Sequence, residues 1–522
     1  MESYIMNSIK PGMEIDAKKI GLPTSGAKIV SVETVREGET AVIPGLPVGP
    51  TGDFVRVMGE IYPADAAAPN ILFTLGIPYE WNGKFLQIGG GGLDGMVTPV
   101  EMPIPGRIFG SPAPTAQNYA VASCDGGHQT DQENPNDCSW GLNNECRANY
   151  AHCAQKKTYD AVVEILKIAF GKAPEKTYYA GGSNGGRETL KVLEQYPQDY
   201  DGAICLYPAQ VFIGKVLKDV RYGNLLEQLG DEAVILPDQW MELQKKIVAM
   251  HDAADGTEDG LVSDLWDARA RRSQVREMLE RELNEKQMCF LDELASDLKL
   301  PFDLGHGHSI VDGYAVYEGA PVIDMFHGFP FVNIYGNCSG ARDTVSIGGA
   351  EGIIKAMIMR DMDFDVRHMD YEAMKKELME ASELFDVSVT SLDRFQEMGG
   401  KLILVQGGAD PLITPYMTIR YYEELKERFG EQELRKMLRF YLIPGYGHGV
   451  GGNYYADVDW LSALDAWVCE GREPRGLVSL DGNDSVGHRM RPVYEYPYYP
   501  VYNGSGDPND ADSYHFKKIE SK

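Results

Sequence analysis

The chain has 522 residues, of which 43% are hydrophobic and 10% aromatic, enough for two domains or for one domain with a large insertion. Its 49 basic and 78 acidic side chains give a net charge of −29, and a surface this negative repels phosphate backbones, which argues against nucleic-acid binding. No apolar run approaches the roughly 20 residues that span a bilayer, and the N-terminus lacks a signal-peptide core, so we expect a cytoplasmic protein without membrane contacts; a secreted protein whose leader has been removed would look the same.

Eight cysteines are too few for a disulfide framework in a chain of this length. Four of them gather between residues 124 and 153, near two histidines (Cys124, Cys138, Cys146, Cys153, His128 and His152). Their spacing matches no tetrahedral zinc pattern, so we expect ordinary thiols.

Short β-type runs alternate with turn signals between residues 27 and 125, in the order FVRVMGEIY, NILFTLGIP, KFLQIGGGG and YAVASCD. Helices and strands then alternate: a helix at 159–170, the strand TYYA, a helix at 185–196 and the strand AICLYPA. This alternation predicts a mostly parallel sheet flanked by helices.

The rhythm breaks at residues 212–398, where we expect longer charged helices at 272–298 and 374–384 and glycine-rich loops. Alternation resumes with a strand at 401–411, a helix at 421–428 and a strand at 439–449. We therefore predict a catalytic α/β domain formed by 1–211 and 399–522, interrupted by an inserted lid domain at 212–398. Such an insertion lies over the carboxyl ends of the strands, where ligands bind.

The segment YYAGGSNGGRETL contains G-x-S-x-G, centred on Ser183. The motif is weak by itself in a chain with 57 glycines, and a plain glycine-rich loop remains an alternative. Its context strengthens it, because a strand, a tight turn of small residues and a helix in succession form the nucleophile elbow of α/β-hydrolases. We therefore predict that Ser183 is a nucleophile.

A serine nucleophile needs a base, and the base needs an orienting acid. In α/β-hydrolases these follow in the order serine, acid, histidine, each just beyond a strand. Asp410 follows KLILVQGGA, and His448 follows FYLIPGYG in a glycine-flanked loop. A single histidine is usually structural, but the order and the strand context together predict a Ser183–His448–Asp410 triad.

Acyl transfer also needs N–H donors for the oxyanion. The residue after the nucleophile, Asn184, should supply one, and the early loop QIGGGGLDG should supply the other from Gly91 or Gly92. A flexible hairpin loop is the alternative interpretation of the four glycines.

The insertion contains an acidic loop, HDAADGTEDGLVSD, with Asp252, Asp255 and Asp259 around two glycines. Three carboxylates in a tight loop suit Ca²⁺, which takes six to eight oxygen ligands. The spacing is not that of an EF-hand, and the bare pattern favours a solvated acidic turn over a calcium site.

Several segments together resemble the tannase/feruloyl esterase family of α/β-hydrolases over nearly the whole chain. These are WNGKFLQIGGGGLDG, YAVASCDGGHQ, GGSNGGRETLKVLEQYPQDYDGAICLYPA, QGGADPLITP, IPGYGHGVGG and YNGSGDPNDADSYHF. The resemblance implies an α/β-hydrolase fold with a lid, an esterase acting on aromatic carboxylic esters, and the same three catalytic residues. It also implies a structural calcium ion in the lid, held by Asp252, Asp255, Asp259 and the carbonyls of Thr257 and Leu261.

The chain departs from that family beside the catalytic residues. Typical members carry a cysteine before the serine and another after the histidine, joined in a disulfide, whereas these positions are Gly182 and Gly449 here. The joint loss fits a reducing compartment. It leaves open how the catalytic loops are held and whether the substrate has diverged.

We expect substrate choice to lie in the lid, where Phe326, Phe329, Phe331 and Tyr335 are available, although for each one taken singly we favour ordinary packing in the lid core. Arg360 fits either a contact with a substrate carboxylate or a surface charge. The expected partner is a small aromatic ester, and self-association into a homo-oligomer stays open. Two alternatives remain: C–C cleavage or elimination on the same fold, and a non-catalytic phenolic-binding protein.

Overall fold

The computed structural model describes residues 2–39, 49–131, 133–326, 329–333, 344–390, 392–483, 487 and 489–519. These residues form two units. The first contains Met1–Cys205, Thr390–Leu402 and Leu464–Gly471, and the second contains Leu206–Val389, Ile403–Ala463 and Arg472–Lys522. Residues 212–398, the predicted lid domain, fall mostly in the second unit together with later parts of the chain, and the predicted domain boundaries stay a prediction.

The first unit is built on a sheet of strands in the order β1-β2-β3-β4-β6-β5-β7-β8. β2, β3, β4 and β6 pair antiparallel in that order, whereas β5 pairs parallel with both β6 and β7. The strands are β1 Glu14–Ile15, β2 Gly26–Val35, β3 Phe54–Tyr62, β4 Ile71–Pro78, β5 Lys84–Ile88, β6 Ala120–Cys124, β7 Lys176–Gly182 and β8 Gly202–Leu206. Each predicted run in this part is therefore a strand, but β2, β3, β4 and β6 pair antiparallel instead of parallel. The segment 63–70 between β3 and β4, for example, is too short for the crossover that a parallel pair needs.

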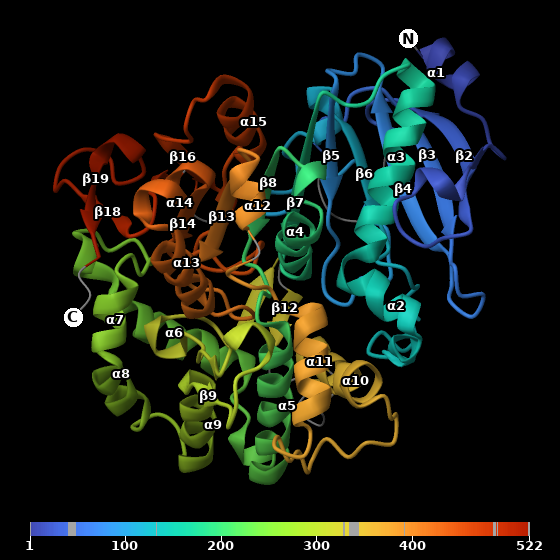
Figure 1. Cartoon of the computed structure of the whole chain (residues 1–522). Coiled ribbons are helices and arrows are strands. Elements are labelled where there is room, and N and C mark those ends of the chain that lie inside the picture. The colour runs from blue at the N-terminus through green and yellow to red at the C-terminus, as the bar shows by residue number, and fades with distance from the viewer. Residues whose placement is uncertain are drawn as a thin grey trace. The chain divides into compact units, whose positions relative to one another are not determined.

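Helices α1 Glu2–Ser8, α2 Asn144–Ala148, α3 Ala154–Phe170 and α4 Asn184–Gln195 complete most of this unit, together with the short α12 Asp393–Glu397. α3 packs on β3, β4 and β6 (Figure 1). Its apolar face (Ala161, Val162, Ile165, Leu166 and Ala169) is buried, and Gly171 ends the helix at a φ of 71°. The core of the first unit lies between this helix and the sheet.

The second unit contains mostly helices and short antiparallel strand pairs. Its helices are α5 Phe212–Leu229, α6 Pro237–Ala249, α7 Leu265–Ala270, α8 Arg272–Leu279, α9 Glu285–Ala295, α10 Val345–Ile353, α11 Lys375–Phe385, α13 Pro415–Phe429 and α14 Glu431–Met437; α15, Trp460–Glu470, crosses the boundary between the units. Its strands are β9 Leu298–Lys299, β10 Ile310–Val311, β11 Ile323–Phe326, β12 Phe329–Asn333, β14 Leu438–Ile443, β15 Ala456–Asp457, β16 Leu477–Asp481, β17 Met490–Val493, β18 Tyr498–Tyr502 and β19 Tyr514–Lys518, together with most of β13 Lys401–Gly407, whose first two residues belong to the first unit. β13 and β14 are neighbouring strands, and the late alternation of the sequence predicts both.

The helix expected at 272–298 is wrong, because two helices, α8 and α9, occupy this stretch. Asn284 starts the second one with a capping box, in which its side chain accepts from the Gln287 N–H and the Gln287 side chain accepts from the Asn284 N–H. These two reciprocal bonds satisfy backbone N–H groups that have no partner at the start of a helix, so a new helix begins at this point. Among the described residues, no helix is long and apolar enough to cross a membrane.

Candidate active site

Ser183 lies on the sharp turn between β7 and α4, as the elbow motif predicts. Its φ of 60° and ψ of −123° are strained for a residue with a side chain. The glycines around it are required by space. A Cβ on Gly181 would lie 2.1 Å from the carbonyl oxygen of Gly185, and a Cβ on Gly185 would lie 2.4 Å from the carbonyl oxygen of Gly90. Close approach of these three glycines therefore lets the half-buried Ser183 stand at the start of a helix, where N–H groups are unpaired.

The glycine loop, residues Gly89–Asp94, follows β5 and lies against this elbow. The N–H of Gly90 donates to the Glu188 carboxylate in α4 (3.1 Å). Gly91 and Gly92 are exposed, and a Cβ at either would meet no atom within 4 Å. The predicted oxyanion donors, Asn184 and one of these two glycines, thus come from adjoining segments of one unit; which glycine donates stays a prediction.

Asp410 and His448 meet in the second unit, after β13 and β14. The His448 Nδ1 lies 2.9 Å from one Asp410 carboxylate oxygen and 3.0 Å from the other. Asp410 is fully buried and also accepts from the N–H groups of Leu412 and Ile413 and from the Gln406 amide. A carboxylate fixed in this way orients the imidazole through Nδ1 and leaves Nε2 to act as a base.

Tyr207, which the sequence analysis does not single out, contacts this histidine. The two rings are 4.7 Å apart between centroids. Gly449 has a φ of 84°, and a Cβ there would lie 2.5 Å from the Tyr207 hydroxyl. Tyr207 therefore fills the space beside the residue that takes the place of the family's second cysteine. Burial and the Asp410 charge raise the pKa of its phenol, which keeps it neutral.

Two buried carboxyl groups, Asp94 and Glu188, were also missed by the sequence analysis. Both touch the glycine loop or the residue after Ser183. The sequence gives little indication of a role for either residue. Asp94 stands in GGLDG and Glu188 in GGRE, but neither has a spacing typical of a catalytic group. Of the predicted triad, Ser183 belongs to the first unit, whereas Asp410 and His448 belong to the second.

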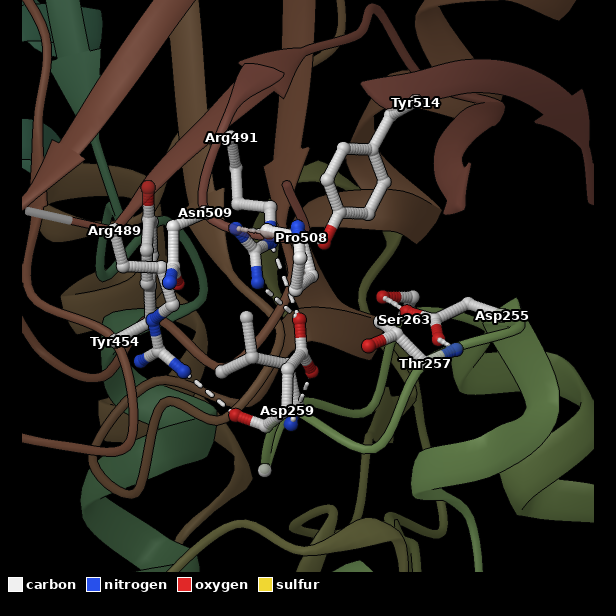
Figure 2. A network of polar contacts seen from close by, with 12 residues as sticks. Asp255, Thr257, Asp259, Ser263, Tyr454, Arg489, Arg491, Pro508, Asn509 and Tyr514 are labelled. Carbon is white, nitrogen blue, oxygen red and sulfur yellow. Dashed lines mark hydrogen bonds and ion pairs between the residues drawn. The ribbon is translucent and has the colours of Figure 1, made fainter. Parts of the chain in front are cut away.

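The acidic loop of the second unit is held by two arginines from β17 and the segment before it. The Arg491 guanidinium pairs with the Asp259 carboxylate, and Arg489 donates to the Asp259 carbonyl at 2.6 Å (Figure 2). The Asp252 carboxylate accepts from the N–H groups of Asp259 and Gly260. The loop therefore binds the C-terminal segment of the chain to the segment after α6.

The donor set of this loop suits a hard cation in part. Asp252 and Asp255 have only neutral donors in the described part of the chain, namely backbone N–H groups and the Ser263 hydroxyl. Burial, with the charges of Asp259 and Asp252, raises the pKa of Asp255 to about 6, as expected for a carboxylate without a cation. Within the described ranges, however, no three metal-binding side chains surround one point, so the loop would have to tighten around an ion.

The other predicted side chains are placed as follows. Tyr335 lies outside the described residues, and Phe326, Phe329 and Phe331 lie in β11 and β12 without described side chains. Arg360 ends the π-helical turn after α10 with a φ of 58°. In the first unit, Cys124, Cys138 and Cys146 are buried thiols.

The family model "Tannase and feruloyl esterase" matches residues 55–516. An uncharacterized esterase of Agrobacterium fabrum is 30% identical over 96% of this chain and 91% of its own length. A probable feruloyl esterase of Arthroderma benhamiae is 27% identical (94% and 91%), and the mono(2-hydroxyethyl) terephthalate hydrolase of Piscinibacter sakaiensis is 24% identical (84% and 80%).

Solved structures agree with the fold. Feruloyl esterase B from Aspergillus oryzae superposes with a TM-score of 0.72 at 21% identity, covering 96% of this chain and 98% of its own. Tannin acyl hydrolase from Aspergillus niger gives a TM-score of 0.70 at 17% identity, covering 99% and 97%. These likenesses confirm the predicted α/β-hydrolase fold. With the match over most of its length, the chain belongs to the tannase and feruloyl esterase family of carboxylic ester hydrolases.

Proposed function

We propose that this esterase hydrolyses esters of aromatic carboxylic acids through a covalent acyl-enzyme on Ser183. The observation that carries the catalytic assignment is the backbone of Ser183: among the described residues it is the one serine with a positive φ, and it stands at a strand-to-helix turn. The Asp410–His448 pair of the same chain has the geometry of an oriented base. The names of the relatives support the aromatic acid, since they act on feruloyl, tannin and terephthalate esters.

In the proposed reaction, the Nε2 of His448 removes the proton from Ser183 as the hydroxyl oxygen attacks the ester carbonyl. Asp410 accepts the Nδ1–H and stabilises the imidazolium. The N–H of Asn184 and that of Gly91 or Gly92 hold the tetrahedral oxyanion. The alcohol leaves with the proton from His448, and water, activated by the same base, then releases the acid from the acyl-enzyme.

The test is a panel of gallate, ferulate, chlorogenate and terephthalate esters, with the Ser183→Ala variant as control. We expect hydrolysis of at least one ester by the wild type, loss of that activity in Ser183→Ala, and an acyl adduct on the peptide containing Ser183 by mass spectrometry. Turnover without any such adduct would favour elimination or C–C cleavage. Binding of phenolics without turnover would favour a non-catalytic protein.

We further propose a structural calcium ion in the acidic loop, held by Asp252, Asp255, Asp259 and the carbonyls of Thr257 and Leu261. The support is the pair of carboxylates that lack a charged partner among the described residues. The ion would supply positive charge to the loop and has no part in the ester chemistry.

Thermal melting in calcium and in chelator tests this site. A ligand at about 100 times its Kd stabilises a fold by about 2.7 kcal/mol, so calcium should raise the wild-type midpoint by several degrees and leave Asp255→Asn unmoved. An equal midpoint in both buffers for the wild type would mean that Arg491 alone balances the loop.

A further inference from the structure

We propose that Asp94 and Glu188 are positioning residues: a buried carboxyl pair that shares one proton and holds the glycine loop against the nucleophile elbow. This inference rests on the proposed function, because the loop and the elbow carry the proposed oxyanion donors. All of its atoms lie in the first unit.

Glu188 joins the glycine loop to α4. Its side chain is 1% exposed, and its Oε2 accepts from the Gly90 N–H and from the Tyr179 hydroxyl, each at 3.1 Å. The backbone contact is close: a Cβ on Gly89 would lie 2.8 Å from this same oxygen and 2.9 Å from the Cα of Gly185. The Gly90 amide is therefore used for anchoring, which leaves the oxyanion to the amides beyond it.

Asp94 makes the matching contact from the loop to the elbow. Its Oδ1 accepts from the Nδ2 of Asn184 at 2.9 Å, and the Asn184 Oδ1 accepts from Arg187 Nε at 2.8 Å. Both ends of the Asn184 side chain are thus fixed, and so is the first residue of α4, whose N–H is a proposed oxyanion donor. The φ of 52° at Asp94 turns the loop back toward the helix.

The two remaining carboxyl oxygens have no donor. Asp94 Oδ2 and Glu188 Oε1 are both buried, and neither has a hydrogen-bond partner among the described residues. If both groups were ionised, they would repel each other, and each would keep one buried oxygen without a hydrogen bond. One proton on Asp94, donated toward the neighbouring Glu188 carboxylate, removes this repulsion and supplies a donor that the pair otherwise lacks.

The surroundings agree with a neutral Asp94. Burial, followed by the charge of Glu188 and contact with it, raises the pKa of Asp94 well above its usual range. Arg187 on α4 is the cation that faces the pair and opposes this rise, but its guanidinium is committed to Asn184 and to the carbonyls of Tyr150 and Ala151. Tyr179 on β7, Cys124 on β6 and Tyr150 also face the pair, and burial raises the pKa of each, so they stay neutral.

The consequence for catalysis is a dependence on alkaline pH. Loss of the shared proton leaves two buried charges that push the glycine loop and the elbow apart. The activity of the wild type should first rise with pH as the proposed base, His448, loses its proton. At a higher, alkaline pH it should then fall as the carboxyl pair loses the shared proton.

Amide substitutions separate this arrangement from ordinary packing. In Asp94→Asn, the new Oδ1 accepts from Asn184 and the new Nδ2 donates to Glu188, as the protonated acid does. In Glu188→Gln, the oxygen accepts from Gly90 and Tyr179 and the nitrogen donates to Asp94. Each single variant should keep kcat within about tenfold and lose the alkaline fall, because neither retains the shared proton. The double variant places two amide donors face to face. Its kcat should fall by a much larger factor than the product of the two factors found for the single variants.

The alanine variants and a matched control complete the test. Asp94→Ala and Glu188→Ala should each lower kcat about 100-fold, the size of effect seen when an oxyanion donor is misplaced. Glu194→Gln, on the same helix but bonded to Lys191 and Gln195, should match the wild type in rate and pH profile. The proposal would be overturned if the double amide variant lost only the product of the two single losses in kcat and the single variants kept the wild-type fall in activity at alkaline pH. It would also be overturned if either alanine variant kept the wild-type kcat.

An infrared measurement keeps this inference distinct from the esterase proposal. The wild type should show the C=O stretch of a buried carboxylic acid at neutral pH, lost in Asp94→Asn and in Glu188→Gln and retained in Glu194→Gln. If no ester is hydrolysed but this band behaves as expected, the proposed function fails and the shared proton stands. If esters are hydrolysed and the band is absent, the reverse holds.

Discussion

At the scale of single residues, the Asp410 carboxylate accepts hydrogen bonds from its own loop and from β13. The N–H groups of Leu412 and Ile413 and the Gln406 amide fix it before the His448 ring is added. These donors therefore set the position of the carboxylate without the histidine, and its proposed role is to select the imidazole tautomer.

Asp410→Asn tests that task. The amide has the same shape, but its NH₂ group facing Nδ1 favours the tautomer that places the proton on Nε2, where a base is needed. We expect kcat to fall about 10⁴-fold while the thermal midpoint changes little. Steady-state kinetics and melting check this. A variant with more than a tenth of the wild-type kcat would contradict the proposed role of Asp410.

Sequence reasoning reached the elbow and the two strand-end residues because each stands in a local pattern of strand, glycine and polar side chain. Asp94, Glu188 and Tyr207 carry no such pattern. Asp94 meets Asn184 across 90 positions, and Tyr207 meets His448 only after the fold has formed. Their roles come from burial and from partners remote in sequence.

At the scale of elements, the elbow and the glycine loop approach each other through backbone atoms. Gly185→Ala places a Cβ 2.4 Å from the Gly90 carbonyl oxygen, which backbone movement alone can relieve. We expect a loss of about 1–3 kcal/mol in stability together with a large loss of kcat, because the loop is displaced from the elbow. Denaturation and ester kinetics measure the two effects. Wild-type kinetics would contradict the close approach described for these segments.

The acidic loop and β17 are joined by a buried ion pair. The side chains of Arg491 and Asp259 are 6% and 9% exposed. Arg491→Met leaves Asp259 without its cation and should cost about 3–5 kcal/mol of unfolding free energy. Chemical denaturation in chelator measures it, since added calcium would compensate.

A matched control exists on the surface. Arg475 pairs with Glu473 but is 70% exposed, so Arg475→Met should cost no more than about 1 kcal/mol. Equal effects of the two substitutions would show that the Arg491 pair contributes no more than a solvated one.

At the scale of the whole molecule, buried histidines make the fold sensitive to acid. His128 is 1% exposed and stacks on Trp140 at 3.5 Å between centroids. Burial lowers its pKa to about 4. Because the unfolded chain titrates near its ordinary pKa of about 6.5, it binds more protons below that value, so this contribution to stability is present above pH 6.5 and is lost as the pH falls toward 4.

His128→Phe keeps a ring against Trp140 and cannot titrate. Between pH 7 and pH 5 the wild type should lose about 2 kcal/mol more stability than this variant. Melting at the two pH values checks it. His368, whose side chain is 83% exposed, supplies the control, and His368→Asn should follow the wild type at both. A parallel pH response of His128→Phe and wild type would contradict the assigned pKa. Location and self-association stay predictions of the sequence analysis.

The sequence by itself determined the alternation of strands and helices, the strand-to-helix elbow at Ser183, the positions of Asp410 and His448 after two late strands, and the family. These are encoded locally, by apolar periodicity, by glycines where backbones must bend or approach, and by polar residues just after strands. The tertiary structure alone decided the antiparallel early strands, the break before Asn284, the arginines of the acidic loop and the carboxyl pair beneath the glycine loop. Those features depend on which side chains lose water together, and residues distant along the chain come together only when the core has formed.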